Sequence, residues 1–218
     1  VYKRQVLANE QVEEGKCWRC KNPVVKTNLS QWFLKITDYA DRLLADLDHM
    51  PGWPERVKIM QRNWIGRSIG TQFFFHVDGM EDTIPVYTTR VDTVYGVTYI
   101  VLAPEHPLVE KLISNNPEKE KIQAFIQEIK NQNDIDRTSE DTPKLGMPTG
   151  SYAVHPLTGE RVPIWIANYV LYEYGTGAVM AVPQGDQRDW DFAKKYNLPV
   201  KIVIQNKAHD LKLDKMDQ

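Results

Sequence analysis

The chain has 218 residues, of which 42% are hydrophobic, and a formal net charge of −2. No apolar run approaches the length of a membrane span and no charged-then-apolar segment indicates secretion, so we expect a cytoplasmic protein with no membrane partner. The small charge excludes a global attraction to nucleic acid, so any contact with RNA must use local basic patches.

The first predicted feature is a strand-turn-strand segment that contains Cys17 and Cys20 in Cys-x-x-Cys spacing. Such a pair can be zinc ligands, a redox pair or incidental cysteines. The surroundings lack a thioredoxin-like βαβ pattern, which favours zinc. A closed structural zinc site needs four ligands, however, and the sequence has no obvious second pair, so we expect only half a metal site.

Two helices are predicted next. Apolar residues recur with helical spacing from Ser30 to Met50, and Ser30 is a suitable N-cap. A Pro-Gly pair ends this helix, and a shorter helix begins at Pro54. The glycines that bound residues 66–70 then indicate a hinge.

Beyond the hinge the pattern becomes rich in strands. Strands are expected at residues 71–77, 84–89, 97–103, 162–171, 178–182 and 200–204. Helices are expected at 107–114, 117–132 and 186–196, with a polar loop at 131–142. This order of elements predicts an α+β fold.

One polar stretch closes the second of these strands with three threonines and an arginine, namely Thr88, Thr89, Arg90 and Thr93. The hydroxyls both donate and accept hydrogen bonds, and Arg90 offers a planar fork for phosphate or carboxylate. The threonines can equally form a structural turn. Arg90 could instead form a structural pair with Asp92 or Glu173.

The most informative stretch combines a glycine turn, an apolar strand and two acids. Gly175 and Gly177 allow a turn that approaches a ligand closely. Pro183 is predicted to open a helix in which Asp186 and Asp189 share one face near the positive N-terminal end. Such a corner can hold a cationic amine, although Asp186 can equally be an ordinary acid of a helix N-terminus.

Seven stretches carry a resemblance to a known family, at residues 6–12, 17–20, 31–37, 60–68, 88–90, 153–159 and 175–189. Together they resemble an internal fragment of a bacterial-type leucyl-tRNA synthetase of class I. The isoleucyl and valyl enzymes are similar in the Thr-Thr-Arg and Gly-Thr-Gly-Ala-Val motifs. They usually lack Val-Met-Ala-Val-Pro followed by Asp-Gln-Arg-Asp, so the leucyl enzyme is favoured.

The resemblance implies a modular organisation. Residues 1–25 would be a partial zinc knuckle (1–5 departing from the family pattern), 26–69 a helical connector of the synthetic domain, 70–206 a β-barrel-like editing domain without its C-terminal part, and 207–218 a polar tail. It implies no cofactor for editing, zinc only in the parent enzyme, and ATP with magnesium only for a synthetic site that this chain lacks. The expected partners are the rest of the synthetase and the 3′ end of tRNA(Leu), with a monomeric state.

The implied function is proofreading. A leucine pocket separates leucine from similar side chains by only ~1–3 kcal/mol, so a second site must hydrolyse tRNA(Leu) that carries isoleucine, norvaline or a similar amino acid. One alternative is a tRNA-docking insert without catalytic competence. Another is the editing segment of an isoleucyl or valyl enzyme.

The resemblance also implies residue roles. Asp189, with help from Asp186, would bind the substrate's ammonium, and Thr93 would fill the space of a leucine side chain. Thr88, Thr89 and Arg90 would bind the ester and sugar-phosphate end. The expected pocket wall consists of Met180 and Val182, and the expected adenosine contacts are Leu171 and Tyr174, although apolar strand residues are more often plain core.

The chemistry is expected to be attack by water. The pocket region has no Ser-His-Asp or Cys-His set and no metal-ligand cluster, so threonine hydroxyls, backbone N–H groups and a tRNA ribose hydroxyl would orient the reaction. The family commonly has Gly-His or Ala-His where this chain has Gln184 and Gly185. A slower site, or one that relies on Gln184, is therefore expected. His106 and His155 precede prolines and are expected to be structural.

Overall fold

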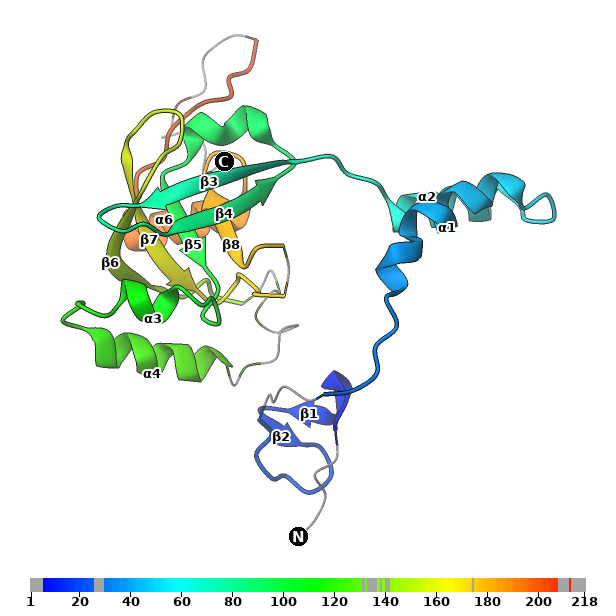
Figure 1. The fold of residues 1–218 in the computed structure, drawn as a ribbon, viewed down its shortest axis with the longest axis horizontal. Helices are drawn as coiled ribbons and strands as arrows, with labels where there is room; N and C mark the ends of the chain where they lie inside the picture. Colours follow the sequence, from blue (N-terminus) through cyan, green and yellow to red (C-terminus); the bar gives the residue numbers. More distant parts are fainter. Residues whose placement is uncertain are drawn as a thin grey trace. The chain divides into compact units, whose positions relative to one another are not determined.

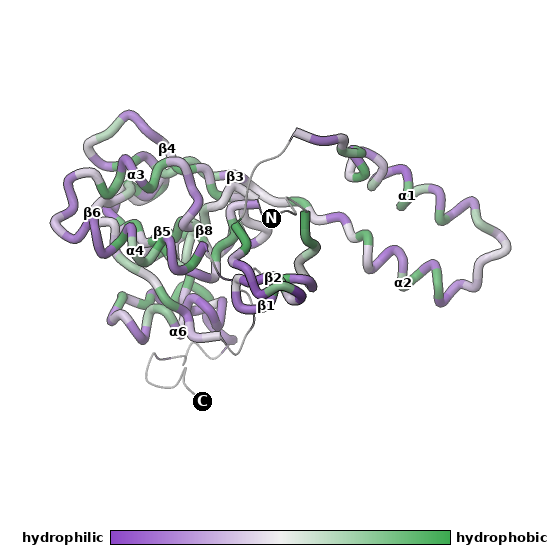
Figure 2. Tube along the Cα trace, turned by 90° about the horizontal axis from the view of Figure 1, so that it is seen from below, coloured by the Kyte–Doolittle hydropathy of each residue, from purple (hydrophilic) through white to green (hydrophobic). Residues whose placement is uncertain are grey.

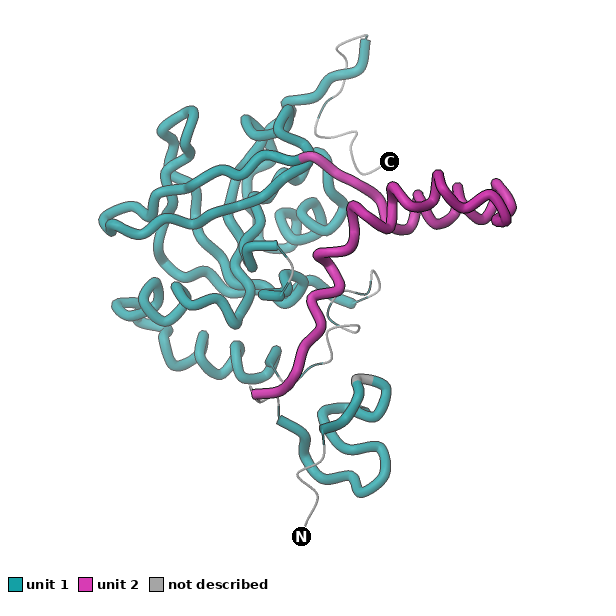
Figure 3. Tube along the Cα trace, turned by 45° about the vertical axis from the view of Figure 1, so that its right-hand side comes forward, with its two compact units in different colours: residues 1–25, 70–218 teal, residues 26–69 magenta. Residues whose placement is uncertain are grey.

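The computed structural model describes residues 6–25, 30–130, 132, 137, 139, 142–173, 175–207 and 212. The chain divides into two compact units, one formed by residues 1–25 with 70–218 and the other by Lys26–Ile69 (Figure 3). In the described residues every helix is too short or too polar to span a bilayer.

A six-stranded sheet forms the centre of residues 70–207 (Figure 1). Its strands are β3 (Thr71–Val77), β4 (Thr83–Thr88), β5 (Tyr99–Leu102), β6 (Gly146–Val154), β7 (Arg161–Ala167) and β8 (Ala178–Ala181). The order across the sheet is β4-β3-β6-β7-β5-β8, and neighbours are antiparallel except for the parallel pair β5–β7. The predicted α+β class is confirmed in this mixed sheet-and-helix form.

Helices cover both faces of the sheet. They are the 3-10 helix η4 (Val91–Gly96), α3 (Val109–Leu112), α4 (Lys119–Lys130) and α6 (Gln187–Tyr196). Strand β5 is buried on both faces because its alternate side chains enter two different cores. Ile100 and Leu102 join the core with α3 and α4, whereas Tyr99 and Val101 join the core with Phe192 of α6.

The expected barrel is wrong as a closed structure. The edge strands β4 and β8 approach within 8 Å between Cα atoms, but no hydrogen-bonded ladder joins them in the described residues. The sheet therefore curls without closing.

Three elements also differ from the prediction. β6 was not predicted, because Pro148 and two glycines interrupt its pattern, and its register indeed shifts between Pro148 and Tyr152. Residues 200–204 contain no strand, although their apolar pattern predicted one. Pro183 does not open α6, which begins after Asp186.

The helical unit of residues 26–69 contains η2 (Ile36–Tyr39), α1 (Ala40–Asp46), η3 (Leu47–His49) and α2 (Glu55–Ile65). The predicted start at Ser30 is wrong, since residues 30–35 are irregular, whereas the start of α2 after Pro54 is confirmed. Hydrophobic and hydrophilic residues alternate along α1 and α2 (Figure 2). Within the described part of this unit only Leu47 is a buried apolar residue, and Trp32 and Trp64 are 101% and 86% exposed.

The N-terminal segment is a short hairpin. It consists of η1 (Asn9–Gln11), β1 (Val12–Glu13) and β2 (Lys16–Cys17). Its turn places Glu14 and Gly15 at positive φ, and Lys21 N–H donates to Cys17 O at 2.8 Å. The expected strand-turn-strand setting of the cysteines is therefore present.

Candidate functional site

Asp189 is a buried carboxylate where β8 meets α6. Its Oδ2 accepts a hydrogen bond from Val182 N–H at 2.9 Å, and its Oδ1 accepts one from the Tyr169 hydroxyl at 3.2 Å. The Tyr99 hydroxyl donates to the main-chain oxygen of Asp189 at 2.9 Å. A carboxylate offers about four acceptor positions, so capacity for a further donor remains.

The electrostatic setting of Asp189 favours its neutral form. Burial raises the pKa of Asp189 to about 7, and the nearby charge of Asp186 adds to the rise. The rise in pKa is opposed by the hydrogen bonds from Val182 N–H and Tyr169 O–H and by the charge of Arg188. A carboxylate in this state gains ionic character when a cation arrives, which suits an ammonium ligand.

Asp186 is the N-cap of α6. Its side chain accepts from the N–H groups of Arg188 and Asp189, and it forms an ion pair with Arg188 at 2.9 Å. Burial alone would raise the pKa of Asp186, but Arg188 and these N–H groups outweigh it and lower the pKa. These contacts agree with the alternative interpretation, in which Asp186 is an ordinary acid of a helix N-terminus.

The threonine-rich stretch forms the turn from β4 into η4. Thr88 Oγ1 accepts from Arg90 N–H at 3.0 Å, and the Thr93 hydroxyl donates to Arg90 O at 2.8 Å. Thr89 is exposed, whereas Thr93 is 6% exposed. Arg90 pairs with Asp92 at 2.8 Å, one of the two partners that we considered, and both side chains remain more than half exposed.

Packing brings η4 and the start of α6 to the same end of the sheet. A Cβ on Gly96 would lie 2.9 Å from Val182 Cγ1, so this glycine lets η4 approach the end of β8. His155 Nε2 lies 2.9 Å from Val94 O, and its Nδ1 accepts from two backbone N–H groups, which makes Nε2 the donor. His155 therefore braces η4, in agreement with the expected structural role.

Val182 connects the two halves of the candidate site. Its N–H binds Asp189, and its side chain borders Gly96, three residues from Thr93. Met180 and Val182 are 6% exposed and belong to the core that contains Val94. These contacts place Met180, Val182 and Asp189 together, with η4, which carries Thr93, packed against Val182.

The loop before β8 has the predicted glycine geometry. Gly175 and Gly177 have φ values of 67° and 68°, and a Cβ on Gly177 would lie 2.6 Å from Tyr172 Cδ2. Leu171 is partly buried in this loop. The prediction for Tyr174 lies outside the described residues.

Gln184 does not have a free amide. Its Oε1 accepts from the N–H groups of Val203 and Ile204, and its Nε2 donates to Ile204 O. Its side chain therefore completes the hydrogen bonds of a segment that was expected to be a strand. Of the two expectations, a slower site or one that relies on Gln184, the second is at odds with these contacts.

Two buried residues of this region, Arg137 and Tyr169, were missed from the sequence. Arg137, only 1% exposed, donates to the carbonyl oxygens of Asn168 and Val170 at 2.9 and 3.0 Å and pairs with Glu105 at 2.9 Å. These bonds hold the backbone on both sides of Tyr169. Arg137 fell within a stretch that was predicted to be a polar loop, and no local signal marks it.

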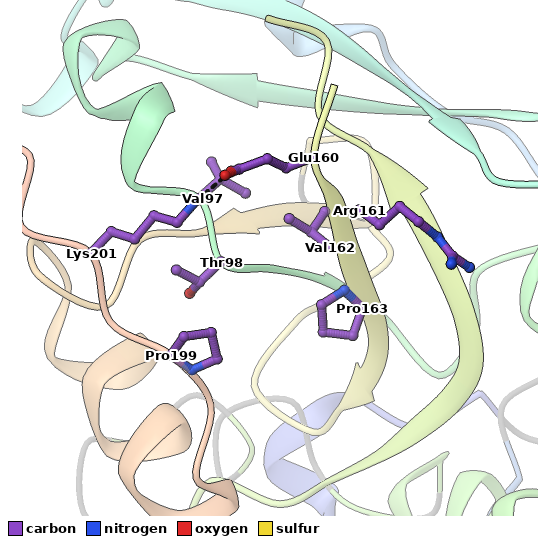
Figure 4. A pocket seen from close by; sticks show the side chains of 8 residues that line it. All are labelled: Val97, Thr98, Glu160, Arg161, Val162, Pro163, Pro199 and Lys201. Carbon is purple, nitrogen blue, oxygen red and sulfur yellow. Dashed lines mark hydrogen bonds and ion pairs between the residues drawn. The ribbon is translucent and has the colours of Figure 1, made fainter. Parts of the chain in front are cut away.

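A pocket of about 420 Å³ is lined by residues other than the candidate site residues (Figure 4). Its lining includes Thr98, Pro163 and Pro199, and a Glu160–Lys201 ion pair borders it. The Thr98 hydroxyl has no hydrogen-bond partner in the described residues.

The cysteine pair provides two metal donors. Hydrogen bonds from the backbone of Cys20 and Arg19 lower the pKa of the Cys17 thiol. No cluster of three or more His, Cys, Asp or Glu side chains suitable for a metal exists in the part of the chain that the structure describes. These residues alone do not fit a closed zinc site.

Comparison with known proteins decides the family. Residues 62–218 match the model of the leucyl-tRNA synthetase editing domain. The chain belongs to the leucyl-tRNA synthetase family. Two leucine–tRNA ligases illustrate this relationship: that of Nitratidesulfovibrio vulgaris strain DP4 is 56% identical over 94% of this chain and 25% of the relative, and that of Thermotoga maritima is 54% identical over 99% and 26%.

A solved leucyl-tRNA synthetase also has this fold. The ternary complex of Agrobacterium radiobacter K84 agnB2 LeuRS with tRNA and LeuAMS matches 95% of this chain and 24% of its own, with 42% identity and a TM-score of 0.70. The chain therefore spans about a quarter of the length of the leucyl-tRNA synthetases that it matches.

Proposed function

We propose that residues 70–206 hydrolyse the ester of mischarged tRNA(Leu) within a leucine–tRNA ligase. The products would be the free noncognate amino acid and tRNA with a free terminal hydroxyl, with water as the nucleophile. The observation that carries this proposal is the buried Asp189 carboxylate, held by Val182 N–H beside the helix that contains Thr93. The family match of residues 62–218 supports the same assignment.

In this proposal the ammonium group of the substrate binds Asp189. A charge-assisted hydrogen bond to a carboxylate in a low-dielectric setting is strong. The ammonium would therefore stabilise the ionised form of Asp189, which burial alone disfavours. Thr93, Met180 and Val182 would limit the side-chain space, so that leucine is excluded. Leu171 and Tyr174 would contact the terminal adenosine, and Thr88, Thr89 and Arg90 the ester and sugar-phosphate end.

Thr93, Met180 and Val182 are each 6% exposed in the described structure, so little of this wall is open to a substrate side chain. The exposed Arg90–Asp92 pair costs little to break, so Arg90 is available to a phosphate. Asp186, by contrast, is committed to the α6 N-terminus and would act on the substrate only through its charge.

The test is deacylation of isoleucyl-tRNA(Leu) and leucyl-tRNA(Leu) by the purified chain. We expect cleavage of the isoleucyl ester alone, cleavage of both esters by Thr93→Ala, and loss of cleavage in Asp189→Ala. Asp191→Asn is the matched control, because Asp191 is an exposed carboxylate of the same helix that accepts only from Gln187 among its recorded hydrogen bonds. Equal cleavage by Asp189→Ala and Asp191→Asn would contradict the role of Asp189.

A second candidate is a docking insert that binds tRNA without cleaving it. The observations that favour it are the fully bonded Gln184 amide and the absence of a side chain at Gly185, where the family commonly has histidine. A folded chain that binds aminoacylated tRNA and protects its ester would establish this alternative. An editing segment of an isoleucyl or valyl enzyme would instead cleave a different mischarged tRNA.

We further propose that the helical unit of residues 26–69 packs against the rest of the ligase. Its large exposed apolar side chains and its lack of a core in the described residues support this assignment. The full-length protein would be a cytoplasmic monomer that binds the 3′ end of tRNA(Leu). Zinc would require ligands beyond Cys17 and Cys20, editing would need no cofactor, and ATP with magnesium would serve only the synthetic site.

A further inference from the structure

Tyr169 is a buried tyrosine whose hydroxyl reaches the Asp189 carboxylate. It lies two residues after the end of β7 and is 5% exposed. Its hydroxyl donates to Asp189 Oδ1 at 3.2 Å, while Val182 N–H occupies Oδ2. The carboxylate is thus held at both oxygens by donors that follow two different strands, β7 and β8.

The position of Tyr169 is fixed from two sides. Arg137 binds the carbonyl oxygens of the residues before and after it, at 2.9 and 3.0 Å. The Tyr169 ring packs edge-on against Phe192 of α6 at 5.7 Å between centroids. Since α6 also carries Asp189, the donor and the acceptor are attached to the same packed core.

We propose that Tyr169 is a positioning residue that holds the Asp189 carboxylate in the orientation and ionised state required to receive the substrate's ammonium. This inference rests on the proposed editing function. Tyr169 acts through Asp189 and does not itself touch the substrate. No sequence motif marks Tyr169.

The other charged and titratable groups around Asp189 leave this role to Tyr169. On α6, Asp186 disfavours the ionised carboxylate and Arg188 favours it, but Arg188 is already paired with Asp186. On β5, the Tyr99 hydroxyl is directed to the main-chain oxygen of Asp189 rather than to its carboxylate. In the described residues, the recorded side-chain hydrogen bond to the Asp189 carboxylate therefore comes from Tyr169.

The test compares Tyr169→Phe with Tyr196→Phe. Tyr196 is a matched control because it belongs to the same aromatic cluster, and its hydroxyl accepts from Gly146 N–H without a recorded bond to Asp189. For cleavage of isoleucyl-tRNA(Leu) near neutral pH, we expect Tyr169→Phe to lower kcat/KM on the order of tenfold, mainly through KM, since it removes a bond to a charged group. The acidic limb of its pH profile should move to higher pH, whereas that of Tyr196→Phe should not.

A second measurement does not depend on activity. Titration of the Asp189 carboxyl by carbon NMR in the free chain should show a higher midpoint in Tyr169→Phe than in the wild type and in Tyr196→Phe. An unchanged midpoint overturns the proposal. Cleavage by the wild type together with equal pH profiles of the two variants also overturns it and leaves the proposed function intact, whereas no cleavage by the folded wild type overturns both.

Discussion

The sheet of residues 70–207 and the helical unit of residues 26–69 bury their apolar side chains to opposite extents. All four residues of β5 are buried, whereas α2 has no buried residue in its whole length. Both elements contain large apolar side chains, so the difference lies in what surrounds them. The sheet carries its own core, whereas the described residues of the helical unit bury a single apolar side chain, that of Leu47.

The largest expected difference between the two units comes from ionisation of the buried Asp189 carboxyl in the sheet unit. The folded pKa of Asp189 is raised to about 7 from an ordinary value of 3.8, so the neutral carboxyl stabilises the fold. This stabilisation is full below about pH 4 and is lost as the pH rises through about 7. The cost of ionisation amounts to as much as ~4 kcal/mol, from about three pKa units at ~1.4 kcal/mol each.

Asp189→Asn should therefore gain stability relative to the wild type as the pH rises between those limits, since asparagine stays neutral. Denaturant unfolding at a series of pH values measures the difference in unfolding free energy between the two proteins. A hydrogen bond that the asparagine amide fails to make would change this difference by the same amount at every pH. Asp48→Asn in the helical unit breaks an exposed pair with Arg62 and should cost under ~1 kcal/mol at each pH. Parallel stability curves for the wild type and Asp189→Asn would contradict the buried-charge interpretation.

A second contrast compares two arginines. Arg137→Met should cost roughly 3 kcal/mol of unfolding free energy, because it leaves two carbonyl oxygens and the partly buried Glu105 without their donor. Arg62→Met removes partly exposed ion pairs with Asp48 and Glu55 and should cost under ~1 kcal/mol. Equal losses, measured by urea unfolding, would show that the two units do not differ in the way described.

The smallest contrast uses the same substitution in both units. Ile164→Val removes one methylene from a fully buried site on β7 and should cost about 1 kcal/mol. Ile59→Val on α2, where the side chain is 49% exposed, should change the free energy of unfolding by under ~0.5 kcal/mol in the isolated chain. A cost at Ile59 that matches the one at Ile164 would mean that α2 is buried in solution, for example in a second copy of the chain.

The sequence predicted those parts whose signals are local. The strand at Thr71–Val77 was placed at its observed limits, and α6 was found from its acids and apolar spacing. Gly175 and Gly177 were expected at a turn and have the positive φ of such residues. Asp189 was selected because two acids with helical spacing follow an apolar strand, and it does lie against the end of that strand.

The remaining parts depend on partners distant in the chain. Tyr169 meets Asp189 across 20 residues, and Arg137 meets Asn168 across 31, so no window of sequence contains either pair. β6 forms despite Pro148 because β3 and β7 flank it and supply its ladder. Residues 30–35 have helical spacing but are irregular, and spacing alone does not create a helix without packing.

The Gln184 amide has a consequence for local motion. The amide bonds to the backbone of Val203 and Ile204 through both an acceptor and a donor, as a neighbouring strand would. The backbone hydrogen bonds recorded for Val203 and Ile204 thus depend on a single side-chain rotamer rather than on a cooperative ladder, so these two amides can open locally while the sheet stays intact. Hydrogen exchange at Val203 and Ile204 should then follow the rotation of Gln184 and be uncoupled from global unfolding.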